Sequence, residues 1–146
     1  MVRSVLAVVL GVVLGGATIS AVELIGNRLY PLPEGIDPNN LEALRASIPD
    51  FPDVPLGWKL MELVAWAFGS AVGGFVAASI ARRSPVVHAA AVGAFFWTAA
   101  AMNMLGGRHP LWLGLVGVAI SLPLPAAYAG AKLALLRRAR AVPGLY

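Results

Sequence analysis

Four long apolar runs constrain this chain more than any other feature of its sequence. They extend over about residues 4–25, 56–81, 85–105 and 111–136. Each matches the ~20 residues that an α-helix needs to cross a hydrocarbon core ~30 Å thick. Because backbone N–H and C=O groups inside lipid must be satisfied within the segment, each run predicts a helix. The predicted fold is therefore an all-α, integral membrane four-helix bundle, antiparallel and up-down, with residues 1–146 forming a single transmembrane domain.

The composition agrees with lipid as the surrounding solvent. Hydrophobic residues make up 59% of the 146 residues and charged residues 12%, about half the share found in a typical soluble domain. The chain has no cysteine, which excludes disulfides, thiolate metal sites and cysteine nucleophiles. Its net charge of +4 comes from basic residues at the ends of apolar runs, a pattern typical of membrane orientation. No nucleic-acid partner is predicted.

The first run has an alternative interpretation as a secretory signal peptide. Arg3 precedes the apolar residues, and Ile19-Ser20-Ala21 provides a small-residue segment of the kind that signal peptidases cleave. The apolar stretch is longer than the usual ~7–15 residues of such peptides, which favours a retained span. Cleavage would leave three spans.

Charge bias predicts the orientation of the spans. The first side of the predicted bundle carries Arg3, Arg82, Arg83, Arg137, Arg138 and Arg140. The other side carries Arg28, Arg45, Lys59 and Arg108, and all seven acids fall between Glu23 and Glu62. Cytoplasmic loops carry an excess of Lys and Arg, so both termini and the Arg82-Arg83 turn are predicted to be cytoplasmic, in a bacterial inner membrane. The outer interface then receives the aromatic residues Tyr30, Trp58 and Trp112.

One long connection, about residues 29–55, forms a proline-rich outer loop. It holds six of the eleven prolines and five acids, which prevents a long helix or a central strand. Residues 37–48 nevertheless predict a short interfacial helix, with Asp37 as its cap, Pro38 at its first position and Pro49 ending it. This helix is either a solvated connector on lipid headgroups, which we favour, or a lid or docking surface.

Small residues indicate where the helices pack. Membrane helices associate by close backbone approach, which glycine permits. The predicted helix-packing residues are Gly11, Gly15, Gly69, Gly73 and Gly74. They favour packing within one bundle, and the alternative is that one stripe forms a homo-oligomer or binds a larger membrane complex.

Two prolines lie inside the fourth run. Pro123 and Pro125 each remove a backbone donor and disturb the carbonyl four residues earlier. A helix kink or a break is expected there. Broken helices form substrate sites in some transporters, but proline is also tolerated in ordinary spans, so a plain kink is favoured.

A candidate polar layer lies near the predicted outer surface. Ionisable residues in a span are costly and count as functional candidates. Sequence offsets place in one layer Glu23, Asn27, Glu62, Asn103 and His109.

Three hypotheses account for this layer. In the favoured one it is structural: Lys59 pairs with Glu62, and Arg28 or Arg108 neutralises Glu23. In the second, the two carboxylates share a proton or bind a cation, because mutual repulsion and desolvation raise one pKa. In the third, the two carboxylates and His109 form a metal site or an acid–base pair, although no metal-ligand spacing supports it.

The whole chain resembles a family of small four-helix bacterial inner-membrane proteins with no established function. The residues that carry the resemblance are Glu23, Tyr30-Pro31, Asp37-Pro38, Gly73 to Ala78, and His109-Pro110-Leu111-Trp112. The resemblance implies the four-helix layout and a bacterial source, and it supplies no activity, cofactor or functional residue.

Function is predicted only by class. A non-enzymatic accessory, packing or oligomeric membrane component is favoured, with no catalytic, cofactor-binding or metal residues. The alternative is a small proton- or cation-coupled transporter that uses Glu23 and Glu62. A membrane enzyme comes third, because the chain lacks a phosphate-binding glycine loop, a Gly-x-Ser-x-Gly motif and a His-Glu-x-x-His motif.

Overall fold

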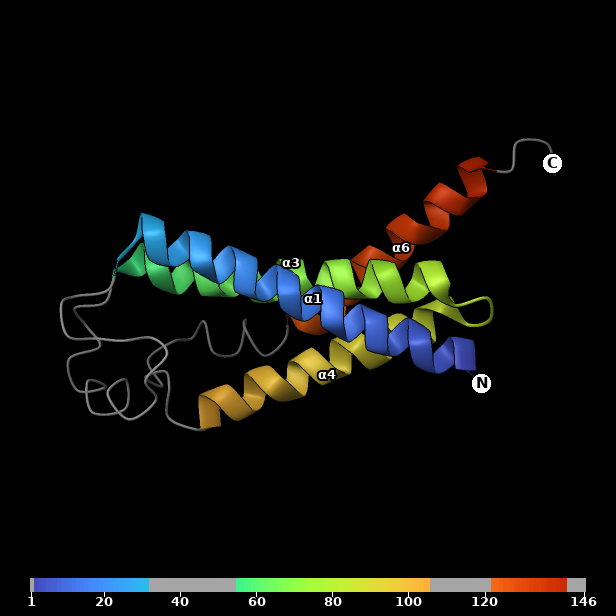
Figure 1. The fold of residues 1–146 in the computed structure, drawn as a ribbon, viewed down its shortest axis with the longest axis horizontal. Helices are drawn as coiled ribbons and strands as arrows, with labels where there is room; N and C mark the ends of the chain where they lie inside the picture. Colours follow the sequence, from blue (N-terminus) through green and yellow to red (C-terminus); the bar gives the residue numbers. More distant parts are fainter. Residues whose placement is uncertain (1, 32–54, 106–121, 142–146) are drawn as a thin grey trace.

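A computed structural model describes residues 2–31, 55–105 and 122–141, with side chains described except at 103–105 and 141. These residues form four α-helices: α1 (Val2–Leu29), α3 (Leu56–Ile80), α4 (Pro85–Leu105) and α6 (Pro123–Ala141). The helices pack as a bundle (Figure 1), and the prediction of an all-α four-helix fold is confirmed. The short helix predicted over residues 37–48 lies outside the described residues.

Three of the helices are long and apolar enough to cross a membrane. They are Val2–Leu29, Leu56–Ile80 and, within α4, Pro85–Met102. Two helices begin where the sequence predicted. Helix α3 begins at Leu56, directly after Pro55, and α4 begins at Pro85. Helix α1 extends beyond the predicted 4–25 at both ends, because hydropathy detects only the lipid-embedded part of a helix whose polar ends continue the same hydrogen bonding.

The fourth helix differs from its prediction. Helix α6 begins at Pro123 and runs to Ala141, past the expected end at Leu136. The expected start of the fourth span, at Leu111, lies outside the described residues. Pro123 occupies the first helical position, where its missing N–H costs nothing, and the Ala126 N–H donates to the Leu122 carbonyl at 3.0 Å. The kink at Pro123 and Pro125 stays a prediction, because the chain before Leu122 is not described.

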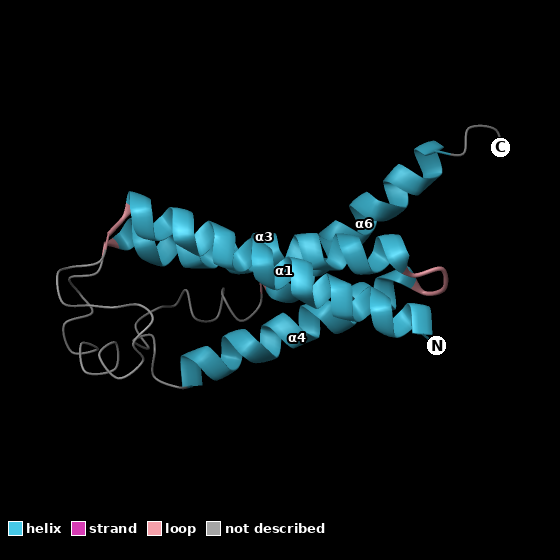
Figure 2. Cartoon of the chain, viewed as in Figure 1, coloured by secondary structure: helices cyan, strands magenta, loops and turns pink. Residues whose placement is uncertain are grey.

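The helices run up and down along one direction. Helices α1 and α3 lie side by side and antiparallel, and α4 returns from the tight turn after Ile80 (Figure 2). Helix α6 crosses α3 obliquely, and its C-terminal end lies toward the same end of the bundle as the N terminus (Figure 1). The turn between α3 and α4 shares this end, so consecutive described helices point in opposite directions (Figure 1).

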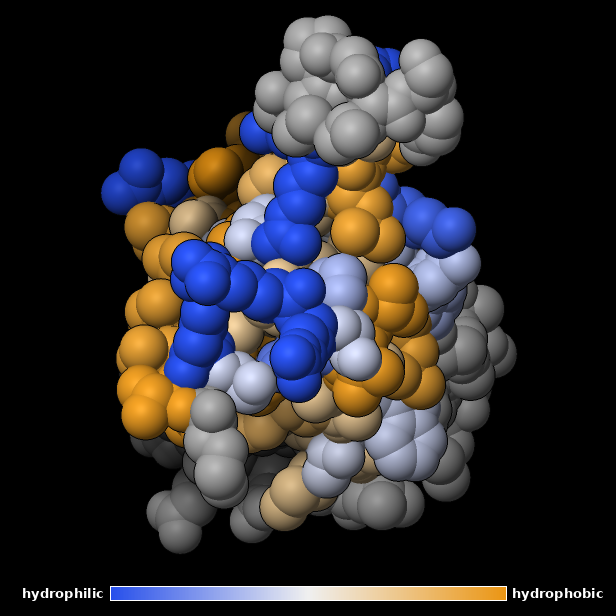
Figure 3. All heavy atoms as spheres, turned by 90° about the vertical axis from the view of Figure 1, so that its right-hand side faces the viewer, coloured by the Kyte–Doolittle hydropathy of each residue, from blue (hydrophilic) through white to orange (hydrophobic). Residues whose placement is uncertain are grey.

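This end of the bundle is strongly hydrophilic. Figure 3 views it directly, with hydrophilic side chains gathered at the centre and hydrophobic side chains around them. Its basic residues are Arg3, Arg82, Arg83, Arg137, Arg138 and Arg140. The structure therefore brings together the cations that the sequence assigned to one side, and we call this the basic end.

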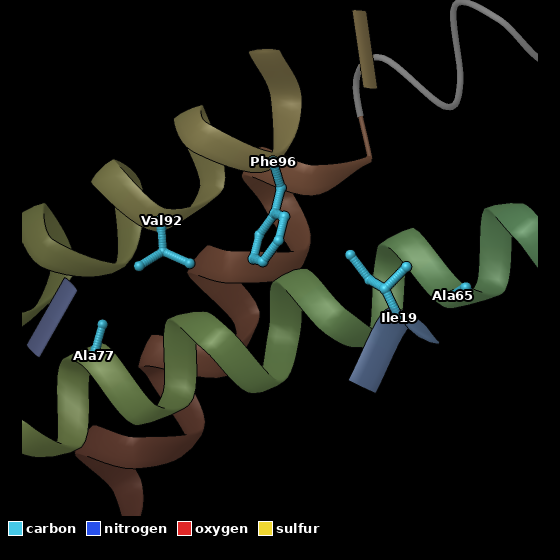
Figure 4. Close-up of a cluster of buried hydrophobic side chains, with 5 residues drawn as sticks. All are labelled: Ile19, Ala65, Ala77, Val92 and Phe96. Atoms are coloured by element: carbon cyan, nitrogen blue, oxygen red, sulfur yellow. The ribbon is translucent and has the colours of Figure 1, made fainter. Parts of the chain in front are cut away.

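The core is small and tightly packed. A cluster of buried residues joins α1, α3 and α4 through Ile19, Ala65, Ala77, Val92 and Phe96 (Figure 4). Val92 and Phe96 extend from α4 toward α3, and the Phe96 ring meets the Trp66 ring edge-on with centroids 6.4 Å apart. Many large apolar side chains remain exposed, including Val13, Phe68 and Phe95 at 57%, 61% and 52%. Lipid tails suit such a surface, which a soluble monomer rarely presents.

Candidate functional site

The contact between α1 and α3 sets the register of the bundle. A Cβ atom at Gly11 would lie 2.8 Å from the Gly73 carbonyl oxygen, and one at Gly73 would lie 2.7 Å from the Gly11 oxygen. Gly15 and Gly69 face each other in the same reciprocal way, both at 2.7 Å. Real Cβ contacts are longer than this, so the two backbones approach as closely as only glycine allows. Gly16, beside Gly15, has open space around it.

The same register continues toward the opposite end, which we call the polar end. A Cβ at Gly26 would lie 2.9 Å from the Met61 Cβ. One turn further, the Trp58 indole N–H donates to the Asn27 side-chain oxygen at 2.6 Å. The predicted layer residue Asn27 therefore joins α1 to α3, through a tryptophan that was expected only to mark the membrane interface.

The two carboxylates of the predicted layer lie at the same height. Gly26 meets Met61, and Ile19 meets Gly69, so the antiparallel register places Glu23 of α1 level with Glu62 of α3. Both side chains are half-buried. Glu23 and Glu62 each interact with another group of the protein.

Lys59 belongs to the same layer and is more buried than either acid. Its exposed fraction is 6%, and it too interacts with another group of the protein. Sequence reasoning considered Lys59 as a partner for Glu62 but did not include it in the layer. The available signal was its position in the first turn of an apolar helix, since a cation that must enter a span needs a polar partner nearby.

The other members of the predicted layer are not placed. Asn103 lies on α4, but its side chain is outside the described part, and His109 lies outside the described residues. Within ranges 2–31, 55–105 and 122–141, no group of three His, Cys, Asp or Glu side chains is arranged to hold a metal ion. What the structure brings together is two carboxylates, one lysine and an Asn–Trp hydrogen bond.

The basic end is organised around the last turn of α3. The final carbonyls of a helix have no intrahelical donor. Here the Arg138 Nη2 lies 2.8, 2.5 and 3.0 Å from the carbonyl oxygens of Ala78, Ser79 and Ala81, so its two hydrogens are shared among three acceptors. The Arg3 Nε donates to the remaining one, Ile80, at 2.7 Å.

Arginines from the first and last helices therefore cap the same helix terminus. A cation at a helix C-terminus is also favoured by the helix dipole. Sequence reasoning assigned Arg3 and Arg138 only to membrane orientation. The carbonyl contacts were missed because sequence shows that a cation lies at an end, but not which neighbouring helix ends beside it.

Comparisons of the chain with protein-family models, with curated proteins and with solved structures found no match. These comparisons therefore identify no family, and the structure establishes the architecture: four described helices, three of them apolar and of membrane length. The function of the site is therefore inferred from the geometry of this chain alone.

Proposed function

We propose that this protein is a non-enzymatic, multi-pass component of a bacterial inner membrane that acts as an accessory or packing partner of other membrane proteins or of its own copies. The proposal is supported by the polar side chains, several of which bond one helix to another. Asn27 bonds to Trp58, Arg3 and Arg138 cap α3, and these contacts all join one helix to another. Such contacts fix helix register, and of the three only the Asn27–Trp58 bond lies in the predicted polar layer.

The proposal includes four membrane crossings with both termini cytoplasmic. Its support is the basic end, where cations from three separate segments meet, because the positive-inside rule places such an end in the cytoplasm. The chain has no cysteine, so single-cysteine variants report topology without background. In intact cells, a membrane-impermeant maleimide should label Pro31→Cys and spare Arg83→Cys. The reverse pattern would overturn the orientation.

The accessory role is tested by extraction in a gentle detergent followed by native mass spectrometry. A stoichiometric partner protein or a defined homo-oligomer is expected. A monomer that carries no protein partner at any detergent concentration would contradict the accessory role.

A second candidate function is a proton- or cation-coupled transporter. It is favoured by the level placement of half-buried Glu23 and Glu62 beside buried Lys59, since ionisable side chains gathered inside membrane-length helices are candidates for proton or cation binding. Proteoliposomes should then show a proton or cation flux that falls with Glu62→Gln. Equal flux for wild type, Glu62→Gln and empty liposomes would eliminate this candidate.

A further inference from the structure

An apolar groove runs between α3 and α6 on the side that α1 does not cover. It has a volume of about 420 Å³, in the range of ligand-sized sites. The α3 side is lined by Phe68, Ala71, Val72 and Phe75, and the α6 side by Ala129, Gly130, Leu133 and Arg137. Every lining side chain except Arg137 is apolar or absent, and the groove lies along a membrane-length helix.

The groove exists because the helices touch at very small residues. The Gly130 Cα approaches the Ala71 carbonyl so closely that no Cβ fits between them. Around this contact, Ala71 and Ala129 contribute only methyl groups. Larger side chains, including Phe68 and Phe75, line the rest of the hollow.

A cation closes one end of the hollow. The Arg137 guanidinium lies 5.2 Å from the centroid of the Phe75 ring, within the range of a cation–π contact. Its neighbour Arg138 is occupied with α3 carbonyls, but a ring contact leaves most of the five Arg137 N–H donors available to an anion. Exposed Arg82, Arg83 and Arg140 add positive charge at the same end.

We propose that this groove binds an anionic phospholipid, with one acyl chain between α3 and α6 and the phosphate on Arg137. The two parts of the groove complement the two parts of such a lipid. Apolar walls extend from Phe68 to Phe75, about 10 Å along α3, and match the upper acyl chain. The guanidinium matches the phosphate, which it can bind with two parallel hydrogen bonds. The proposal needs the bundle to lie in a membrane, and it is independent of the accessory role.

Native mass spectrometry of the full chain tests the proposal by titration with defined lipids. The probes are dioleoyl phosphatidylglycerol, dioleoyl phosphatidylcholine and inorganic phosphate. Wild type is expected to retain the anionic lipid with about tenfold higher affinity than the zwitterionic one, and inorganic phosphate is expected not to compete.

Two variants separate the two parts of the groove. Arg137→Gln should lower the affinity for phosphatidylglycerol about tenfold and that for phosphatidylcholine by less, because the choline cation already offsets the charge of the same phosphate. Ala129→Leu fills the hollow from an exposed position and should weaken both lipids. Arg140→Gln and Ala90→Leu are the matched controls, because both positions are exposed and neither lines the groove. Far-UV circular dichroism establishes that each variant keeps its helices.

Three outcomes would overturn the proposal. If wild type binds the two lipids with equal affinity and Arg137→Gln does the same, Arg137 does not bind the lipid phosphate. Competition by inorganic phosphate at the concentration of the lipid would assign the site to a free anion. A protein dimer that disappears with Ala129→Leu but not with Ala90→Leu would assign the groove to a second copy of the chain.

Discussion

Helix α3 meets α1 and α6 through the same kind of residue, yet the two interfaces differ. Against α1 it presents Gly69 and Gly73 one turn apart, opposite Gly15 and Gly11, and the backbones stay in contact over both turns. Against α6 its one glycine is Gly74, where an added Cβ would lie 2.7 Å from the Ala127 Cα. A paired glycine stripe on both helices closes an interface along its length.

A single glycine on each helix permits only a crossing point. Helix α6 crosses α3 obliquely (Figure 4). Its Gly130 lies against the Ala71 backbone. The apolar groove lies at this crossing and is lined by residues of both helices. The spacing of small residues therefore decides whether an interface is sealed or leaves room for a ligand.

The largest expected effect is at the sealed interface. Gly15→Leu should destabilise the bundle by about 3 kcal/mol or prevent its folding, because the added carbon atoms meet the Gly69 carbonyl and the Phe96 ring at 2.7 Å. Equilibrium unfolding in mixed micelles, followed by circular dichroism, measures the change. Gly16→Leu is the control, since nothing lies within 4 Å of its Cβ position. Equal losses for the two variants would show that helix propensity, not the α1–α3 contact, dominates.

The crossing point is expected to be the next most sensitive. Gly130→Ala should cost about 2 kcal/mol, because its Cβ would overlap the Ala71 carbonyl and meet the Phe75 backbone nitrogen at 2.8 Å. The same unfolding measurement applies. Gly93→Ala is the milder comparison, as its Cβ would meet the Ala127 methyl group at 3.0 Å. A Gly130→Ala protein as stable as Gly93→Ala would mean that α6 shifts freely along α3, and the two interfaces would then differ in rigidity as well as in shape.

Arg138 of α6 caps the C-terminal end of α3, and its substitution tests how much this contact holds the two helices together. Arg138→Gln should lower the free energy of unfolding by about 1.5 kcal/mol, since the α3 carbonyls lose a charged donor. It should also speed amide hydrogen exchange in the last turn of α3 and the first residues after it. Arg140→Gln, two residues away and exposed, should change neither quantity. Matching exchange rates for both variants would assign the stability of this interface to apolar contacts.

The smallest effect is expected at the polar end of the α1–α3 interface. Trp58→Phe removes the bond to Asn27 and should cost about 0.6 kcal/mol, the average for interhelical hydrogen bonds in membrane proteins. Unfolding in mixed micelles again gives the value. Trp97→Phe controls for the loss of an indole, because that side chain is exposed on α4. If Trp58→Phe costs over about 1 kcal/mol more stability than Trp97→Phe, the Asn27–Trp58 bond belongs to a hydrogen-bonded network that includes the carboxylate layer.

Much of the fold could be predicted because lipid allows few solutions. The starts of α3 at Leu56 and of α4 at Pro85 follow from apolar runs that begin beside proline. The basic end follows from where Arg3, Arg82 and Arg137 lie along an up-down chain. The ends of α1 were less predictable, because Asn27 and Arg28 are polar and hydropathy excludes them although the helix continues.

The candidate site was predicted only in part. Offsets from helix ends are sufficient to place Glu23 level with Glu62, because both depend on rise per residue alone. They are insufficient to bring Asn27 to Trp58 or to bury Lys59, because those contacts depend on how each helix is rotated about its axis. Rotation is set by packing against neighbours, which sequence periodicity in an almost uniformly apolar helix does not reveal.

The sequence by itself determined that this chain forms membrane-length helices, that they alternate in direction, and that their cations gather at one end. The reason is that length, hydropathy and charge act on each segment separately. Only the tertiary structure decided that α3 lies between α1 and α6, that Arg138 and Arg3 complete its last turn, and that a groove opens where α6 crosses it. These features depend on the close approach of two backbones, and that is a property of a pair of helices rather than of either one.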